Sequence, residues 1–419
     1  MDLRIFFRIF KGPNLTRLII LLSVIGPGII TAVIDNDAGG IAIYSLAGSN
    51  FGYTTLWVFI PMIIALAVIQ EMSVRMGVVS KKGLESLIRE KTGVKLAFFI
   101  VIALLIANLA TIVAEFLGIA ASTQIFGIPS VIAVPLAGLF VWILVVKGNY
   151  RIVEKIFLGA AVLFFSYIIV AFIANPDWAI VGKDLIIPQV SLSTAYIAII
   201  IALVGTTITP WMHFYLQATV VEKNVPVENL KYSKIDAMTG ALVVNIFAFF
   251  IVIACAATIF KNGIPVNNVI DISLALVPLV GKYAGLLFAF GLLNASLFAA
   301  SVLPLSTAYP VCEILGYESG VSKTFRQAPL FHGIYLGCII FGVVTALIPG
   351  LPVLTILVVS QIVNGILLPF VLILMLRIVN DKEIMGEYTN SRLFNIISWI
   401  TVVTLIILSI AYLFTQFFM

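Results

Sequence analysis

The feature that most constrains this chain is a series of eleven apolar runs, most of which reach the ~20 helical residues that a bilayer core requires. They lie at residues 18–46, 54–77, 96–126, 130–146, 156–174, 194–221, 239–260, 281–315, 332–348, 351–376 and 394–419. Apolar residues make up 62% of the 419 positions, whereas soluble domains contain about 45–50%. The sequence therefore predicts an all-α integral membrane protein with eleven transmembrane helices.

The distribution of basic residues predicts the orientation of these helices, because Lys and Arg accumulate in cytoplasmic loops. Of the 24 Lys and Arg residues, 21 fall in the N-terminal segment and in alternate loops, and the other three are Lys183, Lys261 and Lys282. We predict a protein of the plasma (inner) membrane with a cytoplasmic N-terminus and an extracellular C-terminus. The net charge of +5 then reflects topology, and no nucleic-acid partner is expected.

Polar residues interrupt the first and the sixth apolar run. The first contains "GPGIITAVIDNDAGGIAIYSLAG", and the sixth contains "VGTTITPWMHFYLQATVVEK" with Gly205 and Pro210. Two interrupted helices at corresponding positions of two five-helix halves indicate an inverted-repeat transporter. We predict one transmembrane domain over residues 1–419, with repeats at about 18–174 and 194–376 and an extra helix at about 394–419.

The interrupted first run places a carboxylate, Asp37, deep in the membrane, where it costs at least ~2.5–3.5 kcal/mol and indicates function. Unwound backbone is tolerated there only against protein or a water-filled cavity, and Gly39 and Gly40 would let the chain unwind. Helical rise places Asp37, Thr206 and Gln361 about 15–18 Å inside their helix ends, near the middle of a ~30 Å core. A carboxylate beside freed carbonyl oxygens predicts a cation site.

At these residues the sequence resembles the Nramp family of divalent metal transporters over nearly its whole length. The family's first-span signature Asp-Pro-Gly-Asn falls on residues 37–40, its sixth-span Ala-Thr-Val-Met-Pro-His-Asn on residues 206–212, and its tenth-span Ser-Gln on residues 360–361. The resemblance implies a LeuT-like 5+5 inverted repeat with broken helices 1 and 6. It also implies metal binding by Asp37 and by the carbonyl of Thr206.

Two ligand positions depart from the typical family pattern, because Gly40 replaces the signature Asn and Thr209 replaces the Met. This pattern resembles the Nramp-related magnesium transporters, which implies alternating-access transport of Mg²⁺ and Mn²⁺ without proton coupling. Chemistry agrees, since a thioether favours transition metals whereas Mg²⁺ prefers oxygen ligands and retains water. Six residues form the expected metal site: Asp37, Gly40, Thr206, Thr209, Gln361 and Asn364. The ion is cargo, no resident cofactor is expected, and the protein is expected to be a monomer.

The family's proton route is also altered. Its third-span Asp corresponds to Ile112, its sixth-span His positions correspond to Trp211 and Leu216, and no Lys or Arg lies within 332–348. Glu115 is the one carboxylate that matches a family position there, so residual coupling through it stays open.

Each candidate residue also has a structural interpretation. Asp37 could cap a half-helix N-terminus, and Asp35 could support the site or the entry path, cap a helix or face a solvated vestibule. Thr206 and Thr209 could bond to their own helix backbone, and Gln361 and Asn364 could bridge helices. The role of His213 stays open, with a packed histidine as the default.

Two other functions compete with magnesium transport. One is a proton-coupled importer of Mn²⁺ or Fe²⁺, and the other is an amino-acid or organic-cation permease on the same fold, although Asp37 would repel an anionic substrate group. An enzyme is disfavoured, because the sequence contains no nucleophile–base pair or His-rich cluster.

Overall fold

A computed structural model describes residues 28, 31, 34–146, 165–266, 271–272 and 282–418, and the secondary structure in these ranges is entirely helical. Eight of the described helices are long and apolar enough to cross a membrane, which agrees with an all-α multi-pass membrane protein. The principal helices are α4 (Ala38–Phe51), α5 (Phe59–Ser80), α6 (Leu84–Thr92), α7 (Val94–Ile125), α8 (Ser130–Val146), α10 (Phe165–Ile173), α11 (Trp178–Ile186), α12 (Thr194–Thr207), α13 (Pro210–Glu222), α14 (Leu230–Cys255), α16 (Lys282–Leu315), α17 (Pro329–Ala346), α18 (Val353–Val379), α19 (Lys382–Met385) and α20 (Arg392–Phe418).

Most helix ends lie within three residues of the apolar runs, but α14 begins nine residues earlier than expected. The structure also contains two short helices, α6 and α11, in segments that hydropathy alone assigns to loops. In α6 the buried residues Leu84, Leu87 and Ile88 follow helical spacing, so this helix is amphipathic and packs on the ends of the spanning helices. The expected runs at 18–46 and 156–174 lie partly outside the described residues, and the count of eleven spans stays a prediction.

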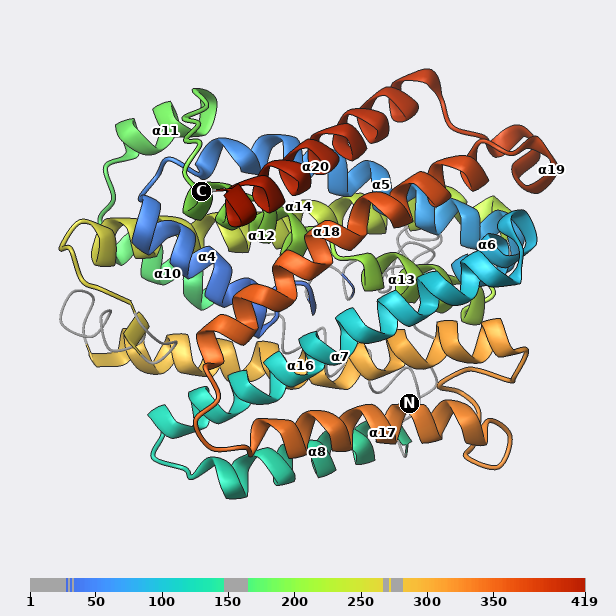
Figure 1. The fold of residues 1–419 in the computed structure, drawn as a ribbon, viewed down its shortest axis with the longest axis horizontal. Coiled ribbons are helices and arrows are strands. Elements are labelled where there is room, and N and C mark those ends of the chain that lie inside the picture. Colours follow the sequence, from blue (N-terminus) through green and yellow to red (C-terminus); the bar gives the residue numbers. More distant parts are fainter. Residues whose placement is uncertain are drawn as a thin grey trace, which may run out of the picture.

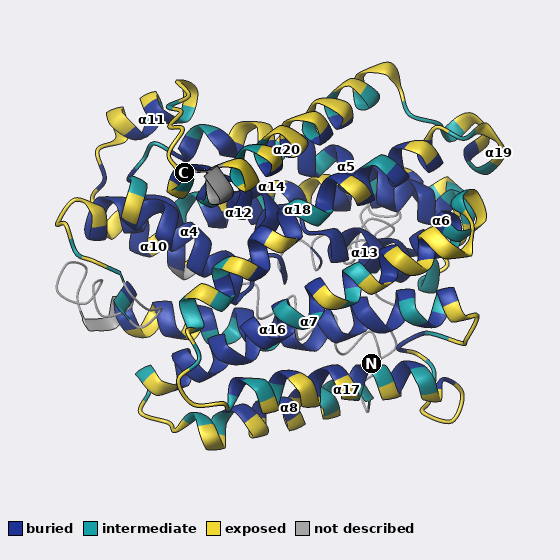
Figure 2. Ribbon diagram, viewed as in Figure 1, coloured by how far each residue is buried: buried dark blue, intermediate teal, exposed yellow. Residues whose placement is uncertain are grey.

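The helices surround a buried centre formed by α4, α7, α12 and α18 (Figure 1). Helices α8 and α17 run together along one flank, where α17 packs on α7 and α16, and α20 covers the opposite flank by packing on α18 and α12. Figure 2 shows buried residues concentrated in the central helices and exposed residues on the flanks. The exposed flank residues are largely apolar, as expected for surfaces that face lipid.

Both interrupted helices are broken as the sequence predicts. Residues Asp35–Asp37 are non-helical, and α4 begins immediately after them. The second break comprises Ile208 and Thr209, and Pro210 occupies the first position of α13, where proline is favoured because its missing N–H would be unpaired there anyway.

The unwound segment includes Asp37, as expected, and it ends there, because Gly39 and Gly40 lie in the first turn of α4. The reason is that Asp37 has extended backbone angles and its side chain accepts a hydrogen bond from the Gly40 N–H, so that it starts the helix as an N-cap residue.

Glycines bring the central helices close together at the level of the breaks. A Cβ on Gly205 of α12 would lie 2.2 Å from the Gln361 carbonyl oxygen and 2.6 Å from the Gly365 nitrogen of α18. A Cβ on Gly118 of α7 would lie 2.5 Å from the Ala38 Cβ. Small residues at such crossings permit backbone contact between membrane helices. Here they bring α12 close to α18 and α7 close to α4 at the level of the breaks.

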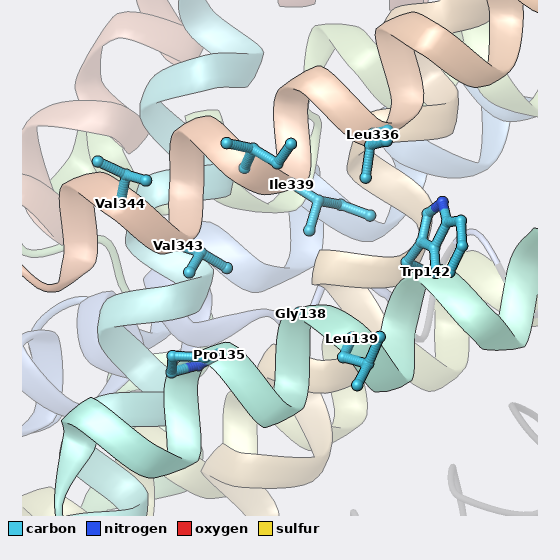
Figure 3. A pocket seen from close by; sticks show the side chains of 9 residues that line it. Pro135, Gly138, Leu139, Trp142, Leu336, Ile339, Val343 and Val344 are labelled. Atoms are coloured by element: carbon cyan, nitrogen blue, oxygen red, sulfur yellow. The ribbon is translucent and has the colours of Figure 1, made fainter.

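An apolar groove of about 250 Å³ separates α8 from α17 on the flank (Figure 3). Its lining consists of Pro135, Gly138, Leu139, Trp142, Leu336, Ile339, Ile340, Val343 and Val344. Figure 3 shows these side chains between the two helices, with the indole nitrogen of Trp142 as the only side-chain heteroatom outside the proline ring. Such a lining offers no ligands to a cation, so we look for the transport site at the helix breaks instead.

The packing at Gly205 gives a testable prediction. Gly205→Ala forces α12 away from α18, and overpacking of this kind costs about 1–3 kcal/mol. We expect a lower thermal unfolding temperature in detergent. Gly337→Ala is the matched control, because a Cβ at this helical position meets no atom within 4 Å. Equal unfolding temperatures for the two variants would contradict the close α12–α18 contact.

Candidate metal-binding site

Asp37 lies at the N-terminus of α4 and is 1% exposed. Its Oδ1 accepts a hydrogen bond from the Gly40 nitrogen at 2.5 Å, and its Oδ2 lies 3.5 Å from the Gln361 Nε2. The capping role that the sequence left open is therefore real. It does not exclude ion binding, because a carboxylate has about four lone-pair sites and these two contacts leave some of them free.

Three oxygen atoms converge on the space beside Gly40. A Cβ at this position would lie 2.9 Å from the Asp35 main-chain oxygen, 3.0 Å from the Thr206 Oγ1 and 3.2 Å from the Asp37 Oδ1. We call this space the Gly40 cradle. It exists because glycine has no side chain, and its three oxygens come from both broken helices. All are hard donors, the type of ligand that Mg²⁺ and Mn²⁺ accept.

Thr206 contributes an unpaired hydroxyl beside the cradle and a carbonyl that lacks its usual helical partner. Its buried Oγ1 has no hydrogen-bond partner among the described residues, so the hydroxyl is not bonded to its own helix as the structural alternative proposed. Its carbonyl would normally accept the N–H of residue 210, but that residue is Pro210, which has none. The sequence-based expectation concerned the carbonyl alone, and the hydroxyl is an additional donor that it missed.

Thr209 lies in the second break and connects it to the first. Its Oγ1 donates a hydrogen bond to the Asp35 Oδ1 at 3.0 Å. Asp35 is 1% exposed, and its Oδ2 has no partner in the described part of the chain. Asp35 therefore does not face a solvated vestibule. Its side chain contacts the second break, and its main-chain oxygen lies beside Gly40.

A chain of amides connects α18 and α7 to Asp37. The Asn364 Nδ2 donates to the Gln361 Oε1 at 3.1 Å and lies 3.3 Å from the Thr111 Oγ1. Gly39 allows this approach, since a Cβ there would lie 2.0 Å from the Gln361 Nε2. The structure thus places Gln361 directly against Asp37, whereas Asn364 bonds to Gln361 and Thr111.

Glu115 on α7 accepts a hydrogen bond from the Ala38 nitrogen at 3.1 Å. Two carboxylates, Glu115 and Asp37, thus bind the first N–H groups of α4, where the helix dipole favours negative charge. This contact gives Glu115 a structural role at the start of α4.

Three carboxyl groups lie around the cradle. Asp35, Asp37 and Glu115 are all buried, and none of the ion pairs in the described ranges involves them. Those pairs include Arg75–Glu71 at 2.9 Å and Lys234–Glu71 at 2.7 Å, which lie away from the breaks. Within the same ranges no three His, Cys, Asp or Glu side chains form a cluster that could hold a metal. The cradle therefore combines carboxyl groups with neutral oxygens, and no basic side chain in the described ranges is paired with those carboxyl groups.

Buried polar groups at two broken helices, inside an all-helical membrane protein, define the class of inverted-repeat, LeuT-like transporters rather than enzymes. Solved structures agree on this fold. A manganese transporter of Eremococcus coleocola, in complex with an aromatic bis-isothiourea substituted compound, superposes with a TM-score of 0.75 at 22% identity, over 97% of this chain and 88% of its own. A Na⁺-coupled sialic acid symporter superposes with a TM-score of 0.59 at 13% identity, over 91% and 89%.

Sequence comparison gives the family. The profile described as natural resistance-associated macrophage protein-like (Nramp) matches residues 28–415, so the chain belongs to the Nramp family. A curated relative, the divalent metal cation transporter MntH of Deinococcus radiodurans, is 26% identical over 414 residues, which are 95% of this chain and 90% of the relative. The family assignment made from the sequence motifs is thus confirmed.

The Gly40 cradle predicts the effect of a single methyl group. In Gly40→Ala the new Cβ occupies the space between the three oxygens, and a steric conflict of about 1–3 kcal/mol corresponds to roughly a tenfold to hundredfold loss of Mg²⁺ affinity. Isothermal titration calorimetry on the purified protein measures it, with Gly337→Ala as the control for an added methyl. Wild-type affinity in Gly40→Ala would show that the ion does not bind there.

Proposed function

We propose that this protein transports Mg²⁺, with Mn²⁺ as a second substrate, by alternating access and without proton coupling. The single observation that supports this most strongly is the Gly40 cradle, in which Asp35, Asp37 and Thr206 direct oxygens at one buried space. The metal ligands in this proposal are the Asp35 main-chain oxygen and the side chains of Asp37, Thr206 and Thr209. Gly40 provides the space, Gln361 orients Asp37, and Asn364 holds Gln361.

The donor set supports a hard ion. Thr209 stands where typical family members carry the sulfur ligand, and the nearest methionine along the chain, Met212, accepts a hydrogen bond at its Sδ from the Gln70 Nε2 at 3.4 Å. That sulfur is therefore directed toward α5. With oxygen donors only, the site favours Mg²⁺ and Mn²⁺ over soft ions such as Cd²⁺.

The residues around the site also support transport without protons. Ile112, Trp211 and Leu216, which occupy the family's proton-route positions, are all fully buried. A proton would have to pass these side chains without a titratable relay. Coupling is not required energetically, since a divalent ion gains ~4.6 kcal/mol per 100 mV at ~2.3 kcal/mol per charge. That energy supports an accumulation on the order of 10³-fold.

The two alternatives fit less well. A proton-coupled Mn²⁺ or Fe²⁺ importer would need Glu115 as its carrier, but Ile112, Trp211 and Leu216 at the other matched proton-route positions offer it no relay partner. A permease for amino acids would bind a substrate carboxylate at the N-terminus of α4, where Asp37 and Glu115 already accept the N–H groups. We further propose a monomer in the plasma membrane with its N-terminus in the cytoplasm, following the distribution of basic residues.

Proteoliposomes that contain a Mg²⁺-sensitive dye or a pH-sensitive dye test this function. We expect Mg²⁺ and Mn²⁺ entry driven by an inside-negative potential, no acidification linked to metal entry, and loss of flux in Asp37→Ala because the site loses a charge that offsets ion desolvation. Gly337→Ala should transport normally. Acidification that follows metal entry and disappears in Glu115→Gln would restore the proton-coupled alternative.

A substitution at the sulfur position tests selectivity separately. Thr209→Met restores a soft ligand, so we expect Cd²⁺ affinity to rise relative to Mg²⁺ affinity. Calorimetry with both ions on wild type and variant measures the ratio. Tight Cd²⁺ binding by the wild type, without a gain in the variant, would contradict the proposed oxygen-only site.

A further inference from the structure

The proposed function uses the main-chain oxygen of Asp35 but assigns no role to its buried side chain. It lies two residues before Asp37 in the same break, and its Oδ1 accepts the hydrogen bond of Thr209 at 3.0 Å. Its Oδ2 is buried without a hydrogen-bond partner in the described ranges. The side chains of the next two residues, Asn36 and Asp37, are also buried, so water is largely excluded from this carboxyl group.

A buried carboxyl group without a partner is stabilised either by taking up a proton or by pairing with a cation. Two carboxylates in one break, those of Asp35 and Asp37, would together neutralise a divalent ion. No Lys, Arg or His forms an ion pair with either of them in the described part of the chain. A bound dication would therefore compensate an ionised Asp35, which no side chain in the described ranges does.

The hydrogen bond to Thr209 has a second consequence. A threonine hydroxyl carries one proton and two lone pairs, and membrane threonines commonly donate that proton to their own helix. Here the proton is directed to Asp35, so the lone pairs of the Thr209 Oγ1 point elsewhere. Outer carboxylates of this kind orient a ligand and increase the electron density on its oxygen, and their removal typically costs about 10–100-fold in metal affinity or activity.

We propose that Asp35 is a positioning and selectivity residue of the ion site: it orients the Thr209 hydroxyl and supplies the second negative charge that a divalent ion requires. The inference rests on the proposed function, since it concerns the same ion. It adds a residue outside the matched family signature and explains why a hydroxyl can replace the sulfur ligand. Because the hydrogen bond joins the two breaks, it also couples the first and sixth spans at the site.

Three variants and one control test the inference by Mg²⁺ and Ca²⁺ flux into proteoliposomes. Asp35→Asn retains an acceptor for Thr209 but removes the charge, Thr209→Val removes the hydroxyl at nearly constant shape, and the third variant combines both. Thr207→Val is the matched control, because Thr207 is a buried neighbour whose hydroxyl lies 3.0 Å from the Tyr44 hydroxyl instead.

We expect each single variant to raise the KM for Mg²⁺ by about 10–100-fold, and Thr207→Val to stay within about twofold of wild type. The double variant should lose less than the product of the two single effects, because residues joined by a hydrogen bond are not additive. The preference for Mg²⁺ over Ca²⁺ should fall in the Asp35 and Thr209 variants, since Mg²⁺ requires shorter and stricter ligand geometry. Loss of folded protein would lower kcat for both ions and leave that ratio unchanged.

The outcomes separate this inference from the function on which it rests. A wild type that moves neither Mg²⁺ nor Mn²⁺ refutes the proposed function. A wild type that transports Mg²⁺, with Asp35→Asn unchanged in KM and in ion preference or with fully additive single effects, refutes the role of Asp35 alone. If Asp35→Asn does not fold, Thr209→Val compared with Thr209→Ser decides the matter, because only the serine retains a hydroxyl for Asp35 to orient. Equal KM and ion preference in those two variants would overturn the proposal.

Discussion

The organisation of this protein depends on one constraint, that a backbone inside a bilayer must satisfy its polar groups without water. Two central helices are broken, so their free ends need partners from the protein. Asp37 and Glu115 accept the first N–H groups of α4, and Pro210 begins α13 without an N–H to satisfy. The partners that stabilise the start of α4 are carboxyl groups, and they place acidic side chains at the centre of the membrane domain.

The glycines that bring the central helices together also shape the proposed ion site. Gly205 and Gly365 allow α12 and α18 to touch, and Gly39 allows Gln361 to reach Asp37. Gly40 leaves a space among three oxygens. A larger residue at any of these positions would meet atoms of another segment or the site oxygens themselves. Stability and transport are therefore coupled here, because the close contacts that hold the core together also determine the size of the cradle.

Several features of the fold and the site could be predicted from the sequence, because they depend on residues that are close together along the chain. Hydropathy located most of the spans to within a few residues, because a membrane helix must be apolar along its whole length. The interruption at Pro210 was visible for the same reason. Hydropathy did not reveal α6, whose composition is that of a polar loop and whose amphipathic face is satisfied only by packing on α7 and α16.

The sequence by itself determined an all-helical membrane protein, the family, and a candidate site at Asp37, because composition, length of the apolar runs and motif residues are properties of the chain alone. Tertiary structure decided which atoms meet: the Thr206 hydroxyl beside Gly40, Thr209 bonded to Asp35, and Gln361 beside Asp37. These contacts join residues up to 324 positions apart, as in the Gln361–Asp37 pair. No periodicity encodes such distances, since they follow from how closely the helices cross and therefore from packing at glycines whose partners lie on other helices.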